Sequence, residues 1–112
     1  MEVCESSGVT ARLSFKNIPL LSQSLQNYID NGCETGGGKR NWLSLRAKIK
    51  VNNEYQTKIL CDPQTSGGLL VFVDPKGTKI VKSILEEYGL VSSPIGHLEK
   101  YTKNNIYIEV CP

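Results

Sequence analysis

The stretch Cys61–Val73, CDPQTSGGLLVFV, contains more structural constraints than a simple surface turn requires. Pro63 fixes its own φ and restricts Asp62 to extended geometry. Gly67 and Gly68 can adopt positive φ, or allow another backbone or an anion to approach closely. The apolar run that follows has the composition of a buried strand. The stretch therefore predicts a rigid, specialised loop that leads into the core.

Three polar residues lie between the Asp-Pro corner and the glycine pair. Gln64, Thr65 and Ser66 supply an amide and two hydroxyls, and the backbone N–H groups of such a loop can converge on an anion. This combination suits a phosphate. A second interpretation stays open, in which Asp62 accepts backbone N–H groups in an Asx-turn and the hydroxyls only stabilise the turn.

Length and composition limit the possible classes of protein. A chain of 112 residues with 39% hydrophobic and 21% charged residues is typical of one soluble domain with a modest core. It has no apolar run near the roughly 20 residues of a membrane helix. A net charge of +2 does not indicate a nucleic-acid partner. We therefore expect a cytoplasmic protein with neither a nucleic-acid nor a membrane partner.

The cysteines and the single histidine do not form a recognisable metal or catalytic pattern. Cys4, Cys33, Cys61 and Cys111 are far apart in sequence and include no CxxC pair. We expect free thiols and no metal site. Because His97 is the only histidine, a Ser-His catalytic arrangement has little support, and no catalytic residue is predicted in this chain.

Hydrophobic spacing predicts the elements of the first half of the chain. They are a half-buried strand over 8–15, a helix from about Leu20 to Asn31, a Gly-rich polar loop from Cys33 to Asn41, a short helical turn capped by Asn41, an extended piece over 47–51, a turn over 52–54, and a lead-in over 55–60 to the Asp-Pro corner.

The second half is predicted to complete an α+β fold, a mixed β-sheet with two helices packed on it. Its expected elements are a central strand over Leu69–Val73 covered on both faces, a helix with Asp74 as its cap and Pro75 as its first residue that ends at Gly89, and two strands over Ser92–Leu98 and Asn105–Val110.

A second glycine-rich stretch, GGGKRN, covers residues 36–41. It lacks the Gly-Lys-Ser/Thr ending of a P-loop. Gly36 and Gly37 nevertheless leave room for a ligand, and Arg40 could bind a phosphate or carboxylate through two hydrogen bonds. The alternative without a ligand is that Arg40 is simply a solvated side chain in a polar loop.

The run DPQTSGGLLV resembles a signature in the C-terminal domain of selenophosphate synthetases, also called selenide, water dikinases. GGGKRN resembles the Gly-Gly-Thr-x-Arg-Asn loop of that family, and SGVTARLSFKNIPLL and Pro94-Ile95-Gly96 resemble flanking segments in the same order. Gly38 departs from the family pattern, because it stands where the family usually has threonine. Arg40 and Asn41 match.

The resemblance implies a two-domain, homodimeric enzyme that uses ATP, water and magnesium (Mg²⁺) to convert selenide into selenophosphate, AMP and phosphate. It implies a fold like the C-terminal domain of aminoimidazole ribonucleotide synthetase-like proteins. In that family the nucleotide, the metal-binding aspartates and the reactive cysteine or selenocysteine belong chiefly to the N-terminal domain.

The resemblance also implies that residues 1–7 are the remnant of an inter-domain helix and residues 8–112 the C-terminal domain, with the N-terminal ATP- and metal-binding domain absent. We expect this chain to be inactive alone and to bind neither ATP nor magnesium tightly. The residues expected to face phosphates at the cleft between domains are Gly36, Gly37, Arg40, Asn41, Asp62, Gln64, Thr65, Ser66, Gly67 and Gly68.

Two alternatives remain at this point. The chain could be a free-standing binding or scaffold domain that uses its Gly-rich face for protein contacts. It could also come from another ATP-binding synthetase of the wider superfamily. The sequence upstream of Met1 would distinguish them, since a reactive cysteine or selenocysteine beside a lysine, followed by aspartate-containing motifs, supports the selenium enzyme.

Overall fold

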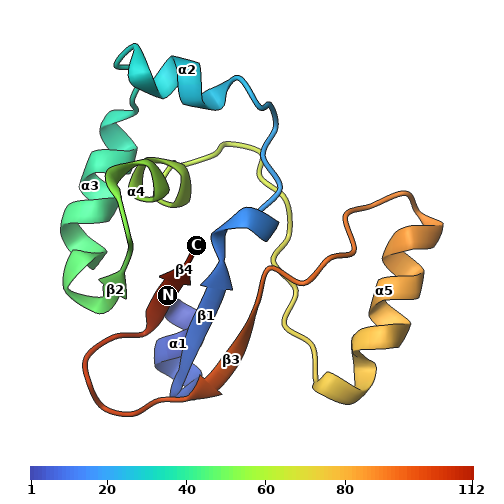
Figure 1. Cartoon of the computed structure of the whole chain (residues 1–112). Coiled ribbons are helices and arrows are strands. Elements are labelled where there is room, and N and C mark those ends of the chain that lie inside the picture. Colours follow the sequence, from blue (N-terminus) through green and yellow to red (C-terminus); the bar gives the residue numbers. More distant parts are fainter. The chain divides into compact units, whose positions relative to one another are not determined.

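The computed structural model describes all residues from 1 to 112, and these divide into two units (Figure 1). The larger unit contains Met1–Pro63 and Ile95–Pro112, and the smaller contains Gln64–Pro94. Each unit is described by itself.

A four-stranded mixed sheet forms the centre of the larger unit. The strands are β1 (Val9–Ser14), β2 (Ile49–Lys50), β3 (Gly96–Lys100) and β4 (Ile108–Cys111), in the spatial order β2-β4-β1-β3. Strand β1 pairs antiparallel with β3 and parallel with β4, and β2 pairs parallel with β4. The predicted α+β class with a mixed sheet is confirmed.

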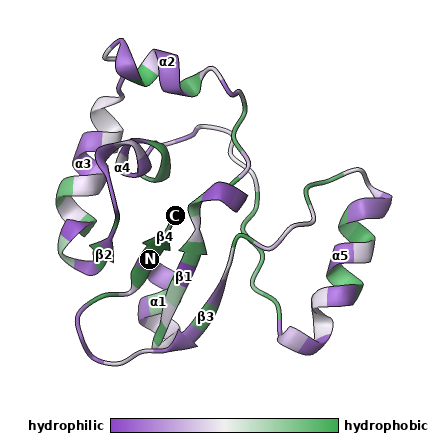
Figure 2. Ribbon diagram, viewed as in Figure 1, coloured by the Kyte–Doolittle hydropathy of each residue, from purple (hydrophilic) through white to green (hydrophobic).

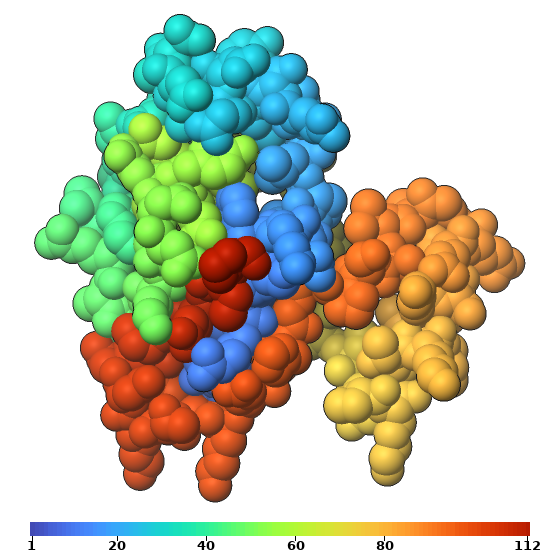
Figure 3. Space-filling model, viewed as in Figure 1, coloured from blue at the N-terminus to red at the C-terminus, as the bar shows by residue number.

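The two faces of the sheet differ in polarity. Ala11 and Val110 are 5% and 2% exposed, whereas Arg12 and its cross-strand partner Glu109 extend from the opposite face. Figure 3 shows residues of β1, in blue, beside those of β4, in dark red. The alternation predicted for the strands over 8–15 and 105–110 is confirmed at Ala11 and Val110, whereas Thr10, predicted on the opposite face, is also buried.

Four helices belong to the larger unit, together with two short 3₁₀ turns. The helices are α1 (Glu2–Ser7), α2 (Leu25–Asp30), α3 (Gly36–Leu45) and α4 (Glu54–Leu60), and the turns cover Phe15–Asn17 and Arg46–Lys48. Helices α2 and α3 both contact α4, and Tyr55 of α4 meets Phe15 edge-to-face with ring centroids 5.7 Å apart. Helix α4 thus contacts two helices and the 3₁₀ turn that directly follows β1.

The Gly-rich segment Cys33–Asn41 was predicted to be a loop, and this prediction is wrong from residue 36 onward. Gly36 begins helix α3, and Thr35 is its N-cap, with Oγ1 accepting the Gly38 N–H at 3.0 Å. Asn41 lies inside the helix and caps nothing. Glycine costs about 1 kcal/mol relative to alanine in a helix interior, so this helix depends on its cap and on tertiary contacts.

Two further helix predictions need correction. Helix α2 starts at Leu25 rather than Leu20, and it ends before Gly32, whose φ is 80°. Residues 54–60, predicted as the end of a turn and a lead-in to the Asp-Pro corner, form α4. Its start is fixed by Asn53, whose side chain accepts the Gln56 N–H at 2.9 Å. This local signal was present in the sequence but was interpreted as a turn.

Strands β3 and β4 begin later than predicted, at Gly96 and Ile108 rather than Ser92 and Asn105. Gly96 permits the close pairing at the start of β3, because a Cβ atom there would lie 2.2 Å from the carbonyl oxygen of Arg12 on β1. One further backbone hydrogen bond, from the Ser14 N–H to the Ile95 carbonyl oxygen at 2.8 Å, precedes the strand.

The smaller unit contains one helix, α5 (Thr78–Glu87), preceded by a 3₁₀ turn over Pro75–Gly77. Asp74 accepts the Lys76 N–H at 2.8 Å and so caps the 3₁₀ turn, whereas α5 itself starts at Thr78 and not at the predicted Pro75. The predicted end is confirmed, since Gly89 has a φ of 66°. Figure 2 shows apolar residues of α5 in green between polar ones in purple.

The central strand predicted over Leu69–Val73 is wrong. These residues form no strand and are all exposed, with Leu69 96% exposed. A strand needs a neighbour for its N–H and C=O groups, and residues 64–94 contain no other strand.

No helix of the structure is long and apolar enough to cross a membrane.

Candidate functional site

The first turns of α3 pack against the Asp-Pro corner. We call this contact, between Gly36–Asn41 and Cys61–Pro63, the α3–corner junction. It joins the two stretches that the sequence singled out, although they are 20 residues apart in the chain. The pairing of these two segments places Asp62 beside a helix N-terminus.

Glycine is required where the helix and the corner come closest. A Cβ atom on Gly37 would lie 2.5 Å from Cγ of Pro63, which is inside van der Waals contact with a stiff ring. A Cβ atom on Gly38 would lie 3.1 Å from Oγ1 of Thr35 and 3.6 Å from the Cys61 carbonyl oxygen. The glycine run therefore serves close packing, in addition to any room that it leaves for a ligand.

Two side chains of the α3 segment hold the corner by hydrogen bonds. The Thr35 hydroxyl donates to Oδ1 of Asp62 at 3.1 Å while it accepts the Gly38 N–H. The Asn41 amide donates to the Cys61 carbonyl oxygen at 2.9 Å. Asn41, predicted to line a phosphate site, thus uses its amide N–H inside the domain.

Two ion pairs hold Glu34, the residue before the N-cap Thr35. Glu34 lies 2.7 Å from Nζ of Lys39 on α3 and 2.5 Å from Nζ of Lys58 on α4. Hydrogen bonds from Lys39 and then from Lys58 lower the pKa of Glu34 to about 2. Because Glu34 contacts both helices, it ties the start of α3 to α4.

The exposed side of the junction has donor groups without partners. The N–H groups of Gly36 and Gly37 belong to the first turn of α3 and have no acceptor. Nη1 of Arg40 would lie 3.4 Å from a Cβ atom on Gly36, so the guanidinium covers this turn, and it forms no ion pair. Lys39 is paired with Glu34. The free donors are therefore Arg40 and the two backbone groups, a set that suits an anion.

Cys61 is not an exposed nucleophile. It is 7% exposed, and burial raises the pKa of its thiol. All four cysteines are free. No group of three or more His, Cys, Asp or Glu side chains comes close enough together to hold a metal ion.

The remaining predicted site residues lie in the smaller unit and are exposed: Gln64, Thr65, Ser66, Gly67 and Gly68. Gln64 folds over its own loop, since Oε1 would lie 3.2 Å from a Cβ atom on Gly67. The hydroxyls of Thr65 and Ser66 form no hydrogen bond within the chain, and neither glycine adopts a positive φ. The loop therefore presents free polar groups without forming a closed anion nest.

The sequence reasoning missed Thr35, Glu34 and Lys58. A signal for Thr35 was available, because a threonine ahead of a helical segment is a common N-cap. The following glycines concealed it, since three glycines favour a loop. Nothing local indicated the partner of Glu34 on α4, which is 24 residues away.

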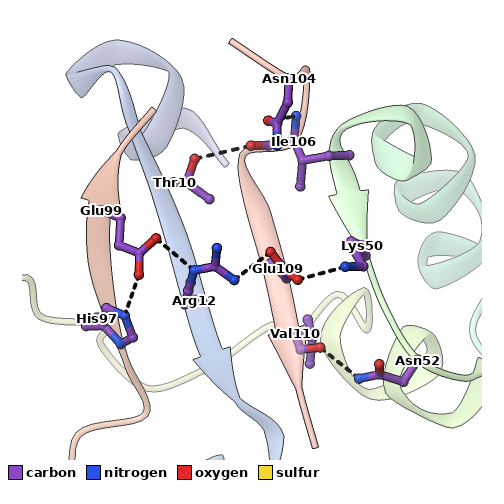
Figure 4. Close-up of polar contacts among 10 residues, drawn as sticks. All are labelled: Thr10, Arg12, Lys50, Asn52, His97, Glu99, Asn104, Ile106, Glu109 and Val110. Atoms are coloured by element: carbon purple, nitrogen blue, oxygen red, sulfur yellow. Dashed lines mark hydrogen bonds and ion pairs between the residues drawn. The ribbon is translucent and has the colours of Figure 1, made fainter. Parts of the chain in front are cut away.

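A second cluster of charges crosses the exposed face of the sheet (Figure 4). Arg12 bridges Glu99 at 2.8 Å and Glu109 at 2.7 Å, Lys50 reaches Glu109 at 2.8 Å, and His97 contacts Glu99 at 3.0 Å. Hydrogen bonds from Arg12 and from Lys50 lower the pKa values of Glu99 and Glu109 respectively. Because these groups satisfy one another across four strands, the cluster stabilises the sheet and is not the candidate site.

Fold and junction together define an α+β domain whose exposed helix N-terminus offers donors for an anion. No family model matches the chain. Curated relatives do match it, namely the selenide, water dikinases of Aeromonas salmonicida (46% identical over 98% of the chain), Sulfurimonas denitrificans (42% over 96%) and Pseudomonas putida (45% over 88%). The matched region is 31%, 31% and 28% of these relatives respectively, so the chain spans about a third of their length.

Over nearly its whole length the chain is similar to selenide, water dikinases, and the match is consistent with a C-terminal domain of such an enzyme. The recognition made from DPQTSGG and GGGKRN is confirmed by these relatives. The further likeness to aminoimidazole ribonucleotide synthetase stays a prediction.

Proposed function

We propose that this chain is the C-terminal domain of a protein that converts selenide, ATP and water into selenophosphate, AMP and phosphate. The observation that carries the proposal is identity of 40–46% to several selenide, water dikinases. In this proposal residues 8–112 are the domain, and residues 1–7, which include α1, are the end of an inter-domain helix.

The α3–corner junction forms one wall of the active-site cleft in this proposal, and the residues from Gln64 to Gly68, which belong to the other unit, are proposed separately as phosphate contacts. Arg40 and the free N–H groups of Gly36 and Gly37 support it, because they are donors that a phosphate accepts. Asp62 has a different role, since a carboxylate repels a phosphate. In the proposed wall it acts as a hydrogen-bond acceptor.

The donor set can be compared with the two groups that the family implies. ATP phosphates fit Arg40 and the first turn of α3, and when bound ATP would supply the transferred phosphoryl group. The carboxylates of this chain do not converge in the number that a magnesium ion needs, so we derive no step through the metal.

The partners belong to the same proposal. The domain works with an N-terminal ATP- and metal-binding domain, and the whole protein forms a homodimer in the cytoplasm. Without that domain the chain does not make selenophosphate and does not bind ATP or magnesium tightly. The support is that the matched relatives are about three times as long as the matched region.

A chimera tests the proposal. The 110 matched residues of the Aeromonas salmonicida enzyme are replaced by this chain, and selenide-dependent formation of AMP is measured. We expect activity in the chimera and none in the chain alone. Inactivity of a folded chimera, or selenide-dependent ATP consumption by the isolated chain, would contradict the corresponding part of the proposal.

Arg40→Ala in the chimera tests the wall. A hydrogen bond to a charged group is worth roughly 1.5–3 kcal/mol, so we expect kcat/KM for ATP to fall by about tenfold or more. Arg46→Ala is the matched control, because Arg46 is exposed and lies outside the junction. Equal activities of the two variants would remove Arg40 from the site.

A further inference from the structure

We propose that Thr35 is a positioning residue that orients the carboxylate of Asp62 toward the active-site cleft. The inference rests on the proposed function, because it assigns a role to Asp62 in that wall. It begins from one hydrogen bond, in which the Thr35 hydroxyl donates to Oδ1 of Asp62 at 3.1 Å.

The direction of that hydrogen bond is fixed by the helix. A hydroxyl has a single proton and two lone pairs. Oγ1 of Thr35 accepts the Gly38 N–H at 3.0 Å as the N-cap of α3, so its proton is directed away from the helix and toward Asp62. The cap and the carboxylate contact therefore reinforce each other.

The remaining contacts of the junction hold the backbone of the corner and not the Asp62 side chain. Asn41 binds the Cys61 carbonyl oxygen, and Gly37 packs against the ring of Pro63. The carboxylate itself is exposed, and Thr35 is its hydrogen-bond partner within the chain. Removal of the Thr35 hydroxyl would free the Asp62 rotamer while the corner stayed in place.

An oriented carboxylate leaves Oδ2 available as an acceptor. Its ligand must donate a hydrogen bond, because an ionised carboxylate has no proton to give. A phosphate oxygen is excluded by charge, so the chemistry selects an O–H or N–H donor, such as a water molecule or a hydroxyl or amino group of the bound substrate. Asp62 would thus hold a donor beside the phosphates that Arg40 contacts.

A double-mutant cycle in the chimera tests this coupling. We expect Thr35→Ala and Asp62→Ala each to lower kcat/KM by about five- to tenfold, and the double variant to be no worse than Asp62→Ala. Thr35→Ser keeps the hydroxyl and should restore the activity. Ser44→Ala is the matched control, since it removes another α3 hydroxyl, one that donates to the Asn41 carbonyl oxygen.

Losses that multiply in the double variant, or a Thr35→Ser variant as impaired as Thr35→Ala, would overturn the proposal. A loss in Thr35→Ala that follows its melting temperature alone would reduce Thr35 to a helix cap.

A measurement on the chain itself separates this inference from the proposed function. The three-bond couplings between Hα and Hβ of Asp62 report how many side-chain rotamers it adopts. We expect one rotamer in the unaltered chain, in Thr35→Ser and in Ser44→Ala, and averaged couplings in Thr35→Ala. Averaged couplings in the unaltered chain would overturn the inference whether or not the chimera is active.

Discussion

Helices α3 and α5 have ten residues each, but they form for different reasons. Helix α5 follows an Asp-Pro start, has a regular apolar spacing and ends near Gly89. Helix α3 opens with three glycines, which disfavour a helix. Its start is held by Thr35 and by contacts with the corner at Cys61–Pro63.

The comparison separates local from tertiary control of structure. The pattern of α5 contains its own start and stop signals, so it can be identified without knowledge of any neighbour. For α3 the glycines are unfavourable locally and necessary globally, because any side chain at residue 37 would strike Pro63. A residue that weakens a helix in isolation can therefore stabilise it in the folded domain.

The largest expected effect is that of Gly37→Ala. Its Cβ would lie 2.5 Å from the Pro63 ring, and overpacking of this kind costs about 1–3 kcal/mol, more than the gain of up to about 1 kcal/mol in helix propensity. The free energy of unfolding in urea should fall accordingly.

Gly36→Ala is the control for that substitution, because the nearest atom to its Cβ is the mobile end of Arg40 at 3.4 Å. We expect it to be neutral or slightly stabilising. A Gly37→Ala variant as stable as Gly36→Ala would show that the close packing does not control α3.

Thr35→Ala should have the next largest effect, since it removes the N-cap of α3 and the donor to Asp62. Loss of a cap costs about 1 kcal/mol. Thr35→Ser should keep most of the stability. The same urea titration measures both variants, and a full loss in Thr35→Ser would indicate that the methyl group matters more than the hydroxyl.

Asp74→Ala should act more locally. Asp74 accepts the Lys76 N–H ahead of α5, and its loss should raise hydrogen exchange of the first α5 amides by about fivefold, equivalent to about 1 kcal/mol. Amides of β1 and β4 report on the larger unit and should not change. A uniform change across both units would contradict local control of α5.

Glu34→Gln should have the smallest effect on stability, greatest at neutral pH and vanishing as the pH falls toward 2. The folded-state pKa of Glu34 is lowered to about 2 from 4.5, so its contribution to stability is present above pH 4.5 and is lost as the pH falls toward 2. Glu34→Gln should therefore flatten the decline in the urea midpoint between these pH values. Glu87→Gln, on α5, is the control and should keep the decline.

Much of the fold followed from spacing in the sequence. Alternation identified the buried positions Ala11 and Val110, and the end of α5 was given by Gly89. The prediction of a strand over Leu69–Val73 failed. Apolar composition indicates that a segment can form a strand, but it does not identify the neighbouring strand that would pair with it.

The candidate site was predictable only in part. Both halves of the junction were identified, because unusual glycine and proline patterns mark places where backbone geometry matters. Their mutual contact, the cap at Thr35 and the internal use of Asn41 were not, since each depends on residues at least 20 positions apart or on a helix that the glycines conceal.

The sequence by itself indicated the similarity to selenide, water dikinases, the α+β class and the local signals of α5, because these depend on residue types and on short spacings. Tertiary structure alone decided that GGGKRN begins a helix, that the helix packs on the Asp-Pro corner, and that Arg40 stays free while Lys39 is paired. The physical reason is that close packing and hydrogen bonding between distant segments can outweigh a local preference of about 1 kcal/mol per glycine.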